Sequence, residues 1–168
     1  IGVPGPKVLS STAVTQDFLM INIPANVTTN SAEFVELAKA QEKGGATLAH
    51  FLLTHPRIAA RAAKIAQTKY DSVRTLRYWA ANANRHGQIA VKYSARPCAN
   101  TPAGHTSQGD NFLREDVKRQ LANGEICFDF YAQPQTDAVA MSIEDSTAVW
   151  DETASVPVRI GRLVVPRT

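Results

Sequence analysis

Residues 112–133 have the sequence FLREDVKRQLANGEICFDFYAQ, and the hydrophobic period changes within this stretch. In its first half, apolar residues recur at every fourth position: Leu113, Val117 and Leu121. This period predicts a helix from Phe112 to Ala122. Asp110 or Asn111 can cap its start, and Gly124 lies just past its end. From position 126 the period becomes two, which predicts a half-buried strand with two unlike faces.

Three further segments have the pattern of strands. After Gly87, apolar residues alternate with others up to Pro97. The segment 158–165 alternates at first and is then continuously apolar, with Gly161 at the expected position of a bulge or tight bend. An earlier apolar run, 15–22, is stopped by Pro24. One early and three late strands, separated by helices, predict an antiparallel α+β fold rather than alternating βαβ units.

The interval between the early and late strands is predominantly helical in pattern. Asn30 and Glu33 have the spacing of a capping box, in which each side chain bonds the backbone N–H of the other. The helix that follows is predicted at 31–42, with Gly44 and Gly45 ending it. Further helices are predicted at 47–53 and from Pro56 to about Thr68. Residues 71–84 have no clean period and are predicted as mixed helix and loop.

The composition bounds the organisation of the chain. Its 168 residues are 44% hydrophobic and 20% charged, which suits one domain or part of one. No apolar run approaches the roughly 20 residues of a membrane-spanning helix, so a transmembrane protein is excluded, and residues 1–10 lack the regions of a signal peptide. The chain begins with Ile1 and ends just after an apolar strand, which indicates a fragment. We expect an N-terminal arm at 1–14 and an incomplete structured region at 15–168, with a helical insertion at 31–86.

Charge and cysteine content narrow the function classes. The net charge is +3, and this small surplus is spread along the chain, which disfavours nucleic-acid binding. The densest basic stretch is expected to be a solvated helix side; it contains Arg57, Arg61, Lys64 and Lys69. Cys98 and Cys127 lie 29 positions apart without a Cys-x-x-Cys motif, and are predicted to be free thiols.

Several motifs that would define an enzyme class are missing from the sequence: a Gly-rich phosphate loop, Gly-x-Ser-x-Gly and His-Glu-x-x-His. The four histidines lack a metal-ligand spacing and are expected at helix entries or on the surface; they are His50, His55, His86 and His105. Arg74 and Tyr78 have the spacing of a tyrosinate metal ligand with its arginine, but a packing tyrosine is the favoured interpretation. The adjacent carboxylates of Glu144 and Asp145 do not by themselves indicate acid–base catalysis.

One strand face carries Asp129, Tyr131 and Gln133 together. These side chains could line a polar cavity. The alternative, which we favour, is that this face meets solvent or a covering helix.

Four segments, in order, resemble the haem-dependent catalases and the catalase-related haem peroxidases. They are FLMINIP (18–24) with AEFV (32–35), GQIAVKYSARP (87–97), LREDVKRQLANGEICFDFYAQ (113–133), and IEDSTAVW (143–150) with PVRIGRLVVPR (157–167). The resemblance covers about residues 15–167. It implies part of an antiparallel β-barrel with inserted helices.

The resemblance also implies a cofactor and site residues. In this family the distal His and its Arg precede the first matching strand, and the proximal Tyr ligand follows the last, so both would lie outside this chain. Asn22 matches an asparagine that helps to place peroxide over the haem. Asn26 and Val27 stand here in place of the family's pocket phenylalanines, and Phe34 matches a later channel aromatic. The resemblance therefore implies that Val27 and Phe34 line the haem pocket or its channel.

Val149 and Trp150 match a Val-Trp pair that contacts a reduced dinucleotide in some catalases. The expected cofactor is therefore haem (iron protoporphyrin), with a dinucleotide as a second candidate. The expected partners are a hydroperoxide substrate, the remaining segments of the polypeptide or a partner chain, and further copies in a homo-oligomer, but neither nucleic acid nor a membrane span. The compartment, cytoplasmic or periplasmic, stays open.

The sequence thus carries two functional hypotheses. In the first, the chain is a portion of a haem protein that decomposes hydrogen peroxide or uses it, or an organic hydroperoxide, as an oxidant. In the second, it is a non-catalytic half-barrel that pairs with another chain or binds a small apolar ligand. The first is the leading hypothesis, and the replacement of the pocket phenylalanines adds weight to the second.

Overall fold

The computed structural model describes residues 12, 17–67, 70, 72–99, 101 and 109–168. The predicted N-terminal arm falls outside these residues except for Thr12, as do His105, Lys69 and most of the loop predicted at 98–111. None of the described helices is both long and apolar enough to cross a membrane.

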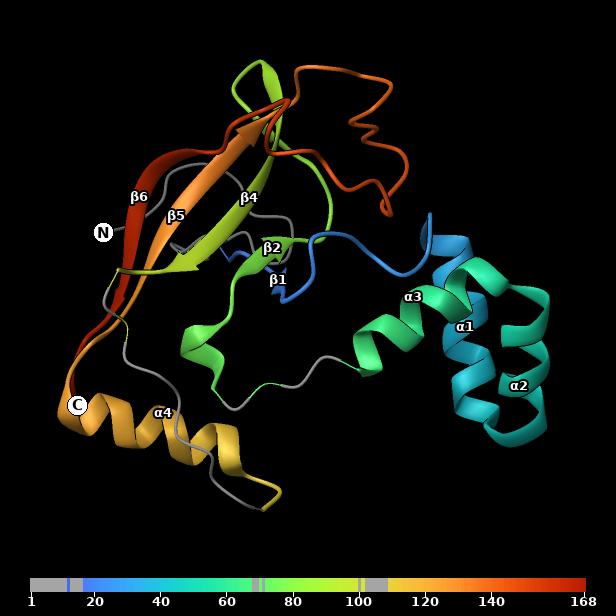
Figure 1. Cartoon of the computed structure of the whole chain (residues 1–168), viewed down its shortest axis with the longest axis horizontal. Helices are drawn as coiled ribbons and strands as arrows, with labels where there is room; N and C mark the ends of the chain where they lie inside the picture. Colours follow the sequence, from blue (N-terminus) through green and yellow to red (C-terminus); the bar gives the residue numbers. More distant parts are fainter. Residues whose placement is uncertain (1–11, 13–16, 68–69, 71, 100, 102–108) are drawn as a thin grey trace.

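An antiparallel sheet forms the centre of the described fold (Figure 1). Its strand order is β1-β2-β4-β5-β6, and β3 pairs with β4 beside this path. The strands are β1 Met20–Ile21, β2 Tyr78–Ala80, β3 Asn84–His86, β4 Ile89–Pro97, β5 Ile126–Pro134 and β6 Val158–Val165. The antiparallel α+β class is confirmed, and among the described residues the sheet is open rather than a closed barrel.

The apolar core of the sheet lies on one face of β4 and β5. The register pairs Tyr93 with Ala132 and Ala95 with Phe130, so these side chains share a face. They form a buried cluster made of Ala80, Val91, Tyr93, Ala95, Phe130 and Ala132. The bulge expected at Gly161 is present, because Phe130 pairs with Gly161 and Tyr131 with Arg159.

Two sequence predictions for the sheet needed correction. The early strand is short: of the described part of the predicted run, 17–22, only Met20 and Ile21 pair with the sheet, whose next strand β2 has three residues. The stretch predicted as mixed helix and loop, 71–84, contains a 3-10 turn at Val73–Thr75, all of β2 and the first residue of β3. Strands of three residues are too short to display an alternating period.

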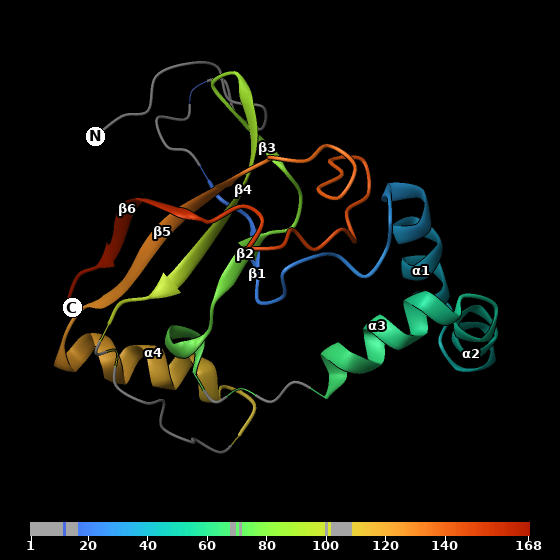
Figure 2. The same ribbon diagram turned by 45° about the horizontal axis from the view of Figure 1, so that its top comes forward.

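Three helices lie beside the sheet and form a cluster of their own (Figures 1 and 2). They are α1 Ser31–Lys43, α2 Gly45–Thr54 and α3 Pro56–Ala66, close to their predicted bounds. Their buried core contains Leu37, Ala40, Phe51 and Ile58. Gly44, at φ 62°, gives the left-handed residue between α1 and α2 that favours glycine.

The capping box at the start of α1 is present in a modified form. Asn30 Oδ1 accepts the Glu33 N–H at 3.0 Å, as predicted. Glu33 Oε2 accepts from the Thr29 N–H at 2.8 Å, one residue before the expected partner. Hydrogen bonds from the Thr29 side chain and then from its backbone N–H hold the pKa of Glu33 below its usual range.

The last helix, α4 (Phe112–Asn123), lies at one end of the sheet (Figures 1 and 2) and agrees with its predicted bounds. Its anchor is Asp116, a fully buried carboxylate whose Oδ2 accepts from Ser72 Oγ at 2.5 Å. Arg74 Nε lies 3.9 Å from the same oxygen. This buried polar group ties α4 to the 3-10 turn.

The two cysteines are not free thiols as predicted but form a disulfide, Cys98–Cys127. The strand register explains the pairing. Pro97 is paired with Phe128, so the next position on each strand brings Cys98 opposite Cys127. A spacing of 29 residues in sequence does not reveal this proximity, because α4 lies between the two strands.

Candidate functional site

The face of the sheet opposite the apolar core is polar and buried. On β4, Lys92 and Ser94 point away from the core cluster because they alternate with its members. On β5, Gln133 does the same and is also buried. Around Lys92, Ser94 and Gln133 this face is covered by an irregular segment, 135–157, rather than by a helix, whereas Asp129 and Tyr131 farther along the face are half-buried. The polar interior therefore lies between the sheet and this segment.

Side chains from the sheet hold the covering segment by its backbone. Gln133 Nε2 donates to the carbonyl oxygens of Trp150, Asp151 and Ser155, at 3.2, 3.2 and 3.0 Å. Lys92 Nζ donates to the Ala148 carbonyl at 2.7 Å and lies 5.5 Å from the centroid of the Trp150 ring. Burial lowers the pKa of Lys92 from its usual value, and Asp145 opposes this effect.

A carboxylate of the covering segment joins two arginines of the sheet. Glu152 Oε1 accepts from Arg77 Nη2, and Glu152 Oε2 accepts from Arg96 Nη2 at 3.1 Å. Another carboxylate on this strand face, Asp129, is bonded instead to Arg159 and Arg162 of β6 at 3.2 and 2.9 Å. The predicted group of Asp129, Tyr131 and Gln133 is thus divided between separate interactions.

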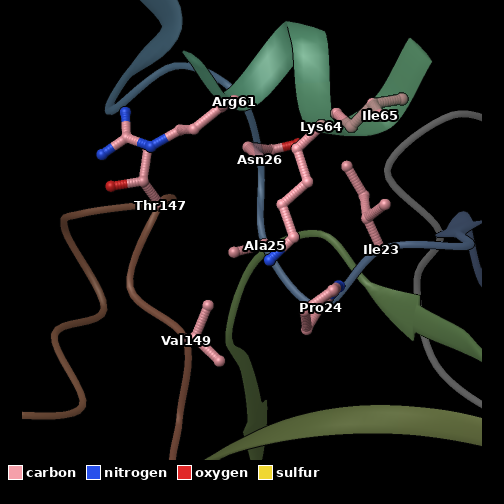
Figure 3. Close-up of a pocket in the computed structure, with 9 residues that line it drawn as sticks. All are labelled: Ile23, Pro24, Ala25, Asn26, Arg61, Lys64, Ile65, Thr147 and Val149. Carbon is pink, nitrogen blue, oxygen red and sulfur yellow. The ribbon is translucent and has the colours of Figure 1, made fainter. Parts of the chain in front are cut away.

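A cavity of about 320 Å³ lies between α3 and the loop that follows β1 (Figure 3). Its lining residues are Ile23, Pro24, Ala25, Asn26, Arg61, Lys64, Ile65, Thr147 and Val149. Figure 3 shows the Lys64 chain extending across the cavity towards Ala25, whereas the Arg61 guanidinium turns towards Thr147. Arg61 Nη1 also donates to the Val27 carbonyl at 3.2 Å. The cavity combines an apolar lining with two cationic side chains.

A second cavity, of about 350 Å³, lies between the polar sheet face and the covering segment. It is lined by Pro24, Trp79, Lys92, Gln133, Val149, Trp150, Asp151 and Glu152. Pro24 and Val149 line both cavities, so the two adjoin at these side chains. Together they offer apolar surface, cations and two indole rings to a ligand.

The structure brings Val149 and Trp150 to these cavities in different ways. Val149 is 59% exposed, whereas Trp150 is 3% exposed and its Nε1 donates to the Ser142 carbonyl at 3.4 Å. Their predicted contact with a dinucleotide stays a prediction.

The three other predicted site residues lie in separate surroundings. Asn22 directly follows β1 and is half-buried. Val27 packs against the core of the three helices rather than against the sheet. Phe34, on α1, is 61% exposed and lines a more polar cavity of about 510 Å³ with Asn30 and Ile143 among its neighbours. Their roles in a haem pocket or channel stay predictions.

Tyrosine and histidine side chains make contacts within the fold. The Tyr78 hydroxyl donates to the Val73 carbonyl at 2.6 Å, its ring packs against the sheet core, and burial raises its pKa. Arg74 lies beside Asp116 rather than beside the Tyr78 hydroxyl, so Arg74 and Tyr78 do not form a ligand pair. His55 stacks on Phe51 with 4.1 Å between ring centroids, and His86 Nδ1 lies 2.8 Å from the Tyr93 hydroxyl. Within the described ranges, no three His, Cys, Asp or Glu side chains gather as a metal site.

Sequence reasoning did not identify Arg77, Arg96, Lys92 and Glu152 as site residues. A signal was present in β4, where Lys92 and Arg96 stand at the alternate positions to Val91, Tyr93 and Ala95. A strand whose second face carries long cations, close to Trp and Tyr residues, indicates a polar interior. The position of Glu152 could not be inferred, because it follows an irregular path.

Comparison with known proteins places the fold. No protein-family model and no curated protein matches the sequence. Among solved structures, the chain is similar to a fungal catalase, with a TM-score of 0.67 and 16% sequence identity. The similarity covers 87% of this chain and 35% of the catalase chain, so the described fold corresponds to about a third of that protein. The chain therefore has a catalase-like fold.

Proposed function

We propose that this chain is a portion of a haem-dependent, catalase-like protein that decomposes hydrogen peroxide or uses a hydroperoxide as an oxidant. The observation that supports the proposal is the likeness of 87% of the chain to the fold of a fungal catalase. Because the likeness spans only 35% of that catalase, the activity is proposed for the whole protein to which this chain contributes.

The apolar face of the sheet fits the wall of a haem pocket. Phe18 lies edge-on to Tyr93 and Phe130, with ring centroids 5.3 and 4.9 Å apart. The same face continues onto β6, where Val158 and Leu163 are paired with Ala132 and Phe128 and stay exposed. The exposed part of this face on β6 suits a flat porphyrin ring or the further segments that would enclose it.

The iron ligands are proposed to come from outside this chain. The resemblance assigns them to a histidine side upstream and a tyrosine downstream of the matching strands. In agreement, the hydroxyls of Tyr78 and Tyr93 are engaged within the fold by Val73 and His86. When bound, haem would supply the iron redox chemistry. The residues of this chain would form the wall and exclude bulk water, and Asn22 would donate a hydrogen bond to the peroxide.

An absorption spectrum and an intact mass of the protein from its natural source test this proposal. A Soret band typical of tyrosinate-ligated ferric haem, with a mass well above 18.2 kDa, is the expected result. A protein of 18.2 kDa that shows no Soret band, even after haem is added, would overturn it.

Asn22 has its own test in the haem-loaded protein. Asn22→Ala should slow peroxide consumption while leaving the Soret band unchanged. The matched variant is Asn84→Ala, at an exposed position of β3, and should leave the rate unchanged. Equal rates for both variants and the unmodified protein would remove Asn22 from the peroxide site.

A second candidate function rests on the two adjoining cavities. Their apolar lining around Pro24 and Val149 suits a small apolar ligand in a non-catalytic half-barrel module. This function requires saturable binding of such a ligand by the 18.2 kDa chain without haem. Failure to bind haem together with such saturable binding would favour the module over the enzyme.

A further inference from the structure

The loop between β1 and α1 carries the acceptor motif for N-linked glycans, Asn-x-Ser/Thr with x other than proline. The motif is Asn26-Val27-Thr28, and no other asparagine of the sequence fits it. Three residues match such a motif often by chance, so the structural surroundings of Asn26 decide whether it can carry a glycan. Figure 3 shows Asn26 on this loop, outside the helices and strands.

The backbone of this loop is held in place, whereas the amide of Asn26 keeps a hydrogen to spare. The Asn26 N–H donates to the Ser146 carbonyl at 2.9 Å, and Ser146 Oγ donates to the Thr28 carbonyl at 2.6 Å. Asn26 Nδ2 makes an exposed hydrogen bond to Asn82 Oδ1 at 3.2 Å, and it has no second acceptor among the described residues. Because an amide nitrogen carries two hydrogens, a sugar can replace one of them while the other keeps the bond to Asn82.

Asn26 lines the cavity of about 510 Å³ to which Phe34 also contributes. We refer to it as the Phe34 cavity, and its volume falls in the range of roughly 300–1,000 Å³ that is typical of ligand sites. Glu144 is the one charged side chain among its lining residues. Hydroxyl and amide side chains form most of the remaining lining: Thr28, Thr29, Asn30, Ser31, Asn82 and Ser146. Such a lining suits the hydroxyl groups of a neutral sugar better than it suits an ion.

Two apolar side chains of the Phe34 cavity are exposed to solvent. Phe34 is 61% exposed and Ile143 is 51% exposed. A pyranose ring has an apolar C–H face, so a sugar that covers these side chains removes their surface from water. The cavity thus offers partners for both the polar and the apolar sides of a sugar ring.

The disulfide Cys98–Cys127 is an independent observation on the compartment in which the chain folds. Disulfides form and persist in oxidising compartments such as the lumen of the endoplasmic reticulum. N-linked glycans are attached to proteins in this same lumen, on segments that become surface loops of secreted proteins. The disulfide and the motif therefore point to one route of synthesis.

We propose that Asn26 is an N-glycosylation site and that the first sugar of its glycan lies in the Phe34 cavity. In the transfer, Asn26 Nδ2 loses a proton and bonds the anomeric carbon of a lipid-linked oligosaccharide. The lipid pyrophosphate leaves with the electron pair of the broken C–O bond. Thr28, whose hydroxyl the transferase has to reach, is 3% exposed, so the transfer precedes folding. The inference does not depend on haem.

Mass spectrometry of the protein from its natural source tests the modification. Trypsin should release residues 8–39 as one peptide, because neither Lys nor Arg occurs between Lys7 and Lys39. Peptide N-glycosidase should remove the mass of one glycan from this peptide and leave an aspartate at position 26. A peptide that carries no glycan, or one that carries it at Asn22 or Asn30, would overturn the proposal.

Variants expressed through the secretory route of a eukaryotic host separate the motif from the fold. Thr28→Val removes the hydroxyl but keeps the shape of this buried side chain, and it should abolish the glycan. Thr28→Ser keeps the hydroxyl and should retain the glycan, as should the control Asn84→Gln, which lies outside the motif. Gel mobility before and after glycosidase treatment measures occupancy even in a variant that does not fold. A glycan that persists in Thr28→Val would contradict the assignment.

The position of the sugar has a test of its own, in which Asn26→Gln removes the glycan from three backgrounds: the unmodified chain, Phe34→Ala and Val35→Ala. Val35 is the matched control, because it is 46% exposed on the same helix but does not line the Phe34 cavity. Loss of the glycan should lower the thermal midpoint of the unmodified chain and of Val35→Ala by about 2–4 °C, the shift expected for one modest contact in a chain of this size. The shift should be smaller in Phe34→Ala. Equal shifts in Phe34→Ala and Val35→Ala would show that the sugar does not lie in the cavity.

Discussion

Cys98 and Cys127 are joined across the ends of β4 and β5, with 5.6 Å between their Cα atoms. The Cys98 N–H also donates to the Cys127 carbonyl at 3.2 Å, so the disulfide extends the strand ladder by one pair. The bond encloses α4 and the chain on both sides of it. It thereby fixes the helix and the two central strands at the same end of the sheet.

Replacing both cysteines, as Cys98→Ser with Cys127→Ser, should lower the free energy of unfolding by roughly 3 kcal/mol. The reason is that the unfolded chain gains the freedom of a loop of 29 residues. Urea unfolding of the two proteins measures the difference. The unmodified chain in a reducing agent should lose the same amount, and the double variant should not respond to the agent. Equal stability of both proteins would show that the disulfide adds nothing.

Leu37→Ala should destabilise the helical cluster by roughly 2–5 kcal/mol, because it leaves a cavity among buried side chains. Leu53→Ala is the matched change on the neighbouring helix and should alter stability by no more than about 0.5 kcal/mol. The exposed fractions are 8% for Leu37 and 82% for Leu53. Thermal unfolding followed by helical circular dichroism measures both. Similar losses from the two variants would mean that the helices do not pack as described.

Gln133→Leu should destabilise the fold by roughly 2–3 kcal/mol, because the carbonyls of Trp150, Asp151 and Ser155 lose their shared donor. Tryptophan fluorescence should change with it as the covering segment loosens around Trp150. Gln41→Leu, at an exposed position of α1, is the control and should have little effect. A fully stable Gln133→Leu protein would contradict the tethering role of this amide.

Acid should weaken the covering segment. Asp137, Asp145 and Asp151 each accept hydrogen bonds from residues just downstream, and these bonds hold their pKa values below the usual range. For Asp145 the largest cause is the Thr147 hydroxyl, followed by the Thr147 N–H. Because the folded pKa lies below the unfolded one, this stabilisation is full above about pH 4 and is lost as the pH falls through the folded pKa.

The measurement is the urea midpoint at about pH 6 and about pH 3, on either side of the carboxyl range. Asp145→Asn keeps an oxygen acceptor for Thr147 but has no titrating group. Its loss of stability between the two pH values should be smaller than that of the unmodified chain. The contrary result, an equal loss in both proteins, would place the acid-sensitive group elsewhere.

Much of the fold was predictable because a long segment with a regular hydrophobic period indicates its own secondary structure. Helix α4 and strand β5 follow from the change of period near Gly124, and the start of α1 follows from Asn30 and Glu33. Short elements carry no such signal. Strand β2 has three residues. It pairs with β4 through Tyr78 and Trp79, which lie opposite Ala95 and Ser94. Only the finished sheet reveals that pairing.

The candidate site was harder to predict for the same reason. Lys92 and Arg96 stand at alternate positions of a strand, but the Glu152 that binds Arg96 comes from an irregular segment 56 residues away. The disulfide was missed likewise, since the register of β4 and β5 and not the spacing of Cys98 and Cys127 brings the sulfurs together. Long-range pairing decides both, and a single sequence does not encode it in a local pattern.

The pairing of β1 with β2 affects how the sheet assembles and how far the helical segment can vary in length. Ile21 lies opposite Trp79, so the three helices leave the sheet and return to it at neighbouring points. Their contacts are local, and a cluster of local contacts forms rapidly. The pairing of Ile21 with Trp79 must instead close a long loop, and the entropy of that closure grows only slowly with its length. The helical excursion can therefore lengthen or shorten over evolutionary time at little cost to the sheet from which it emerges.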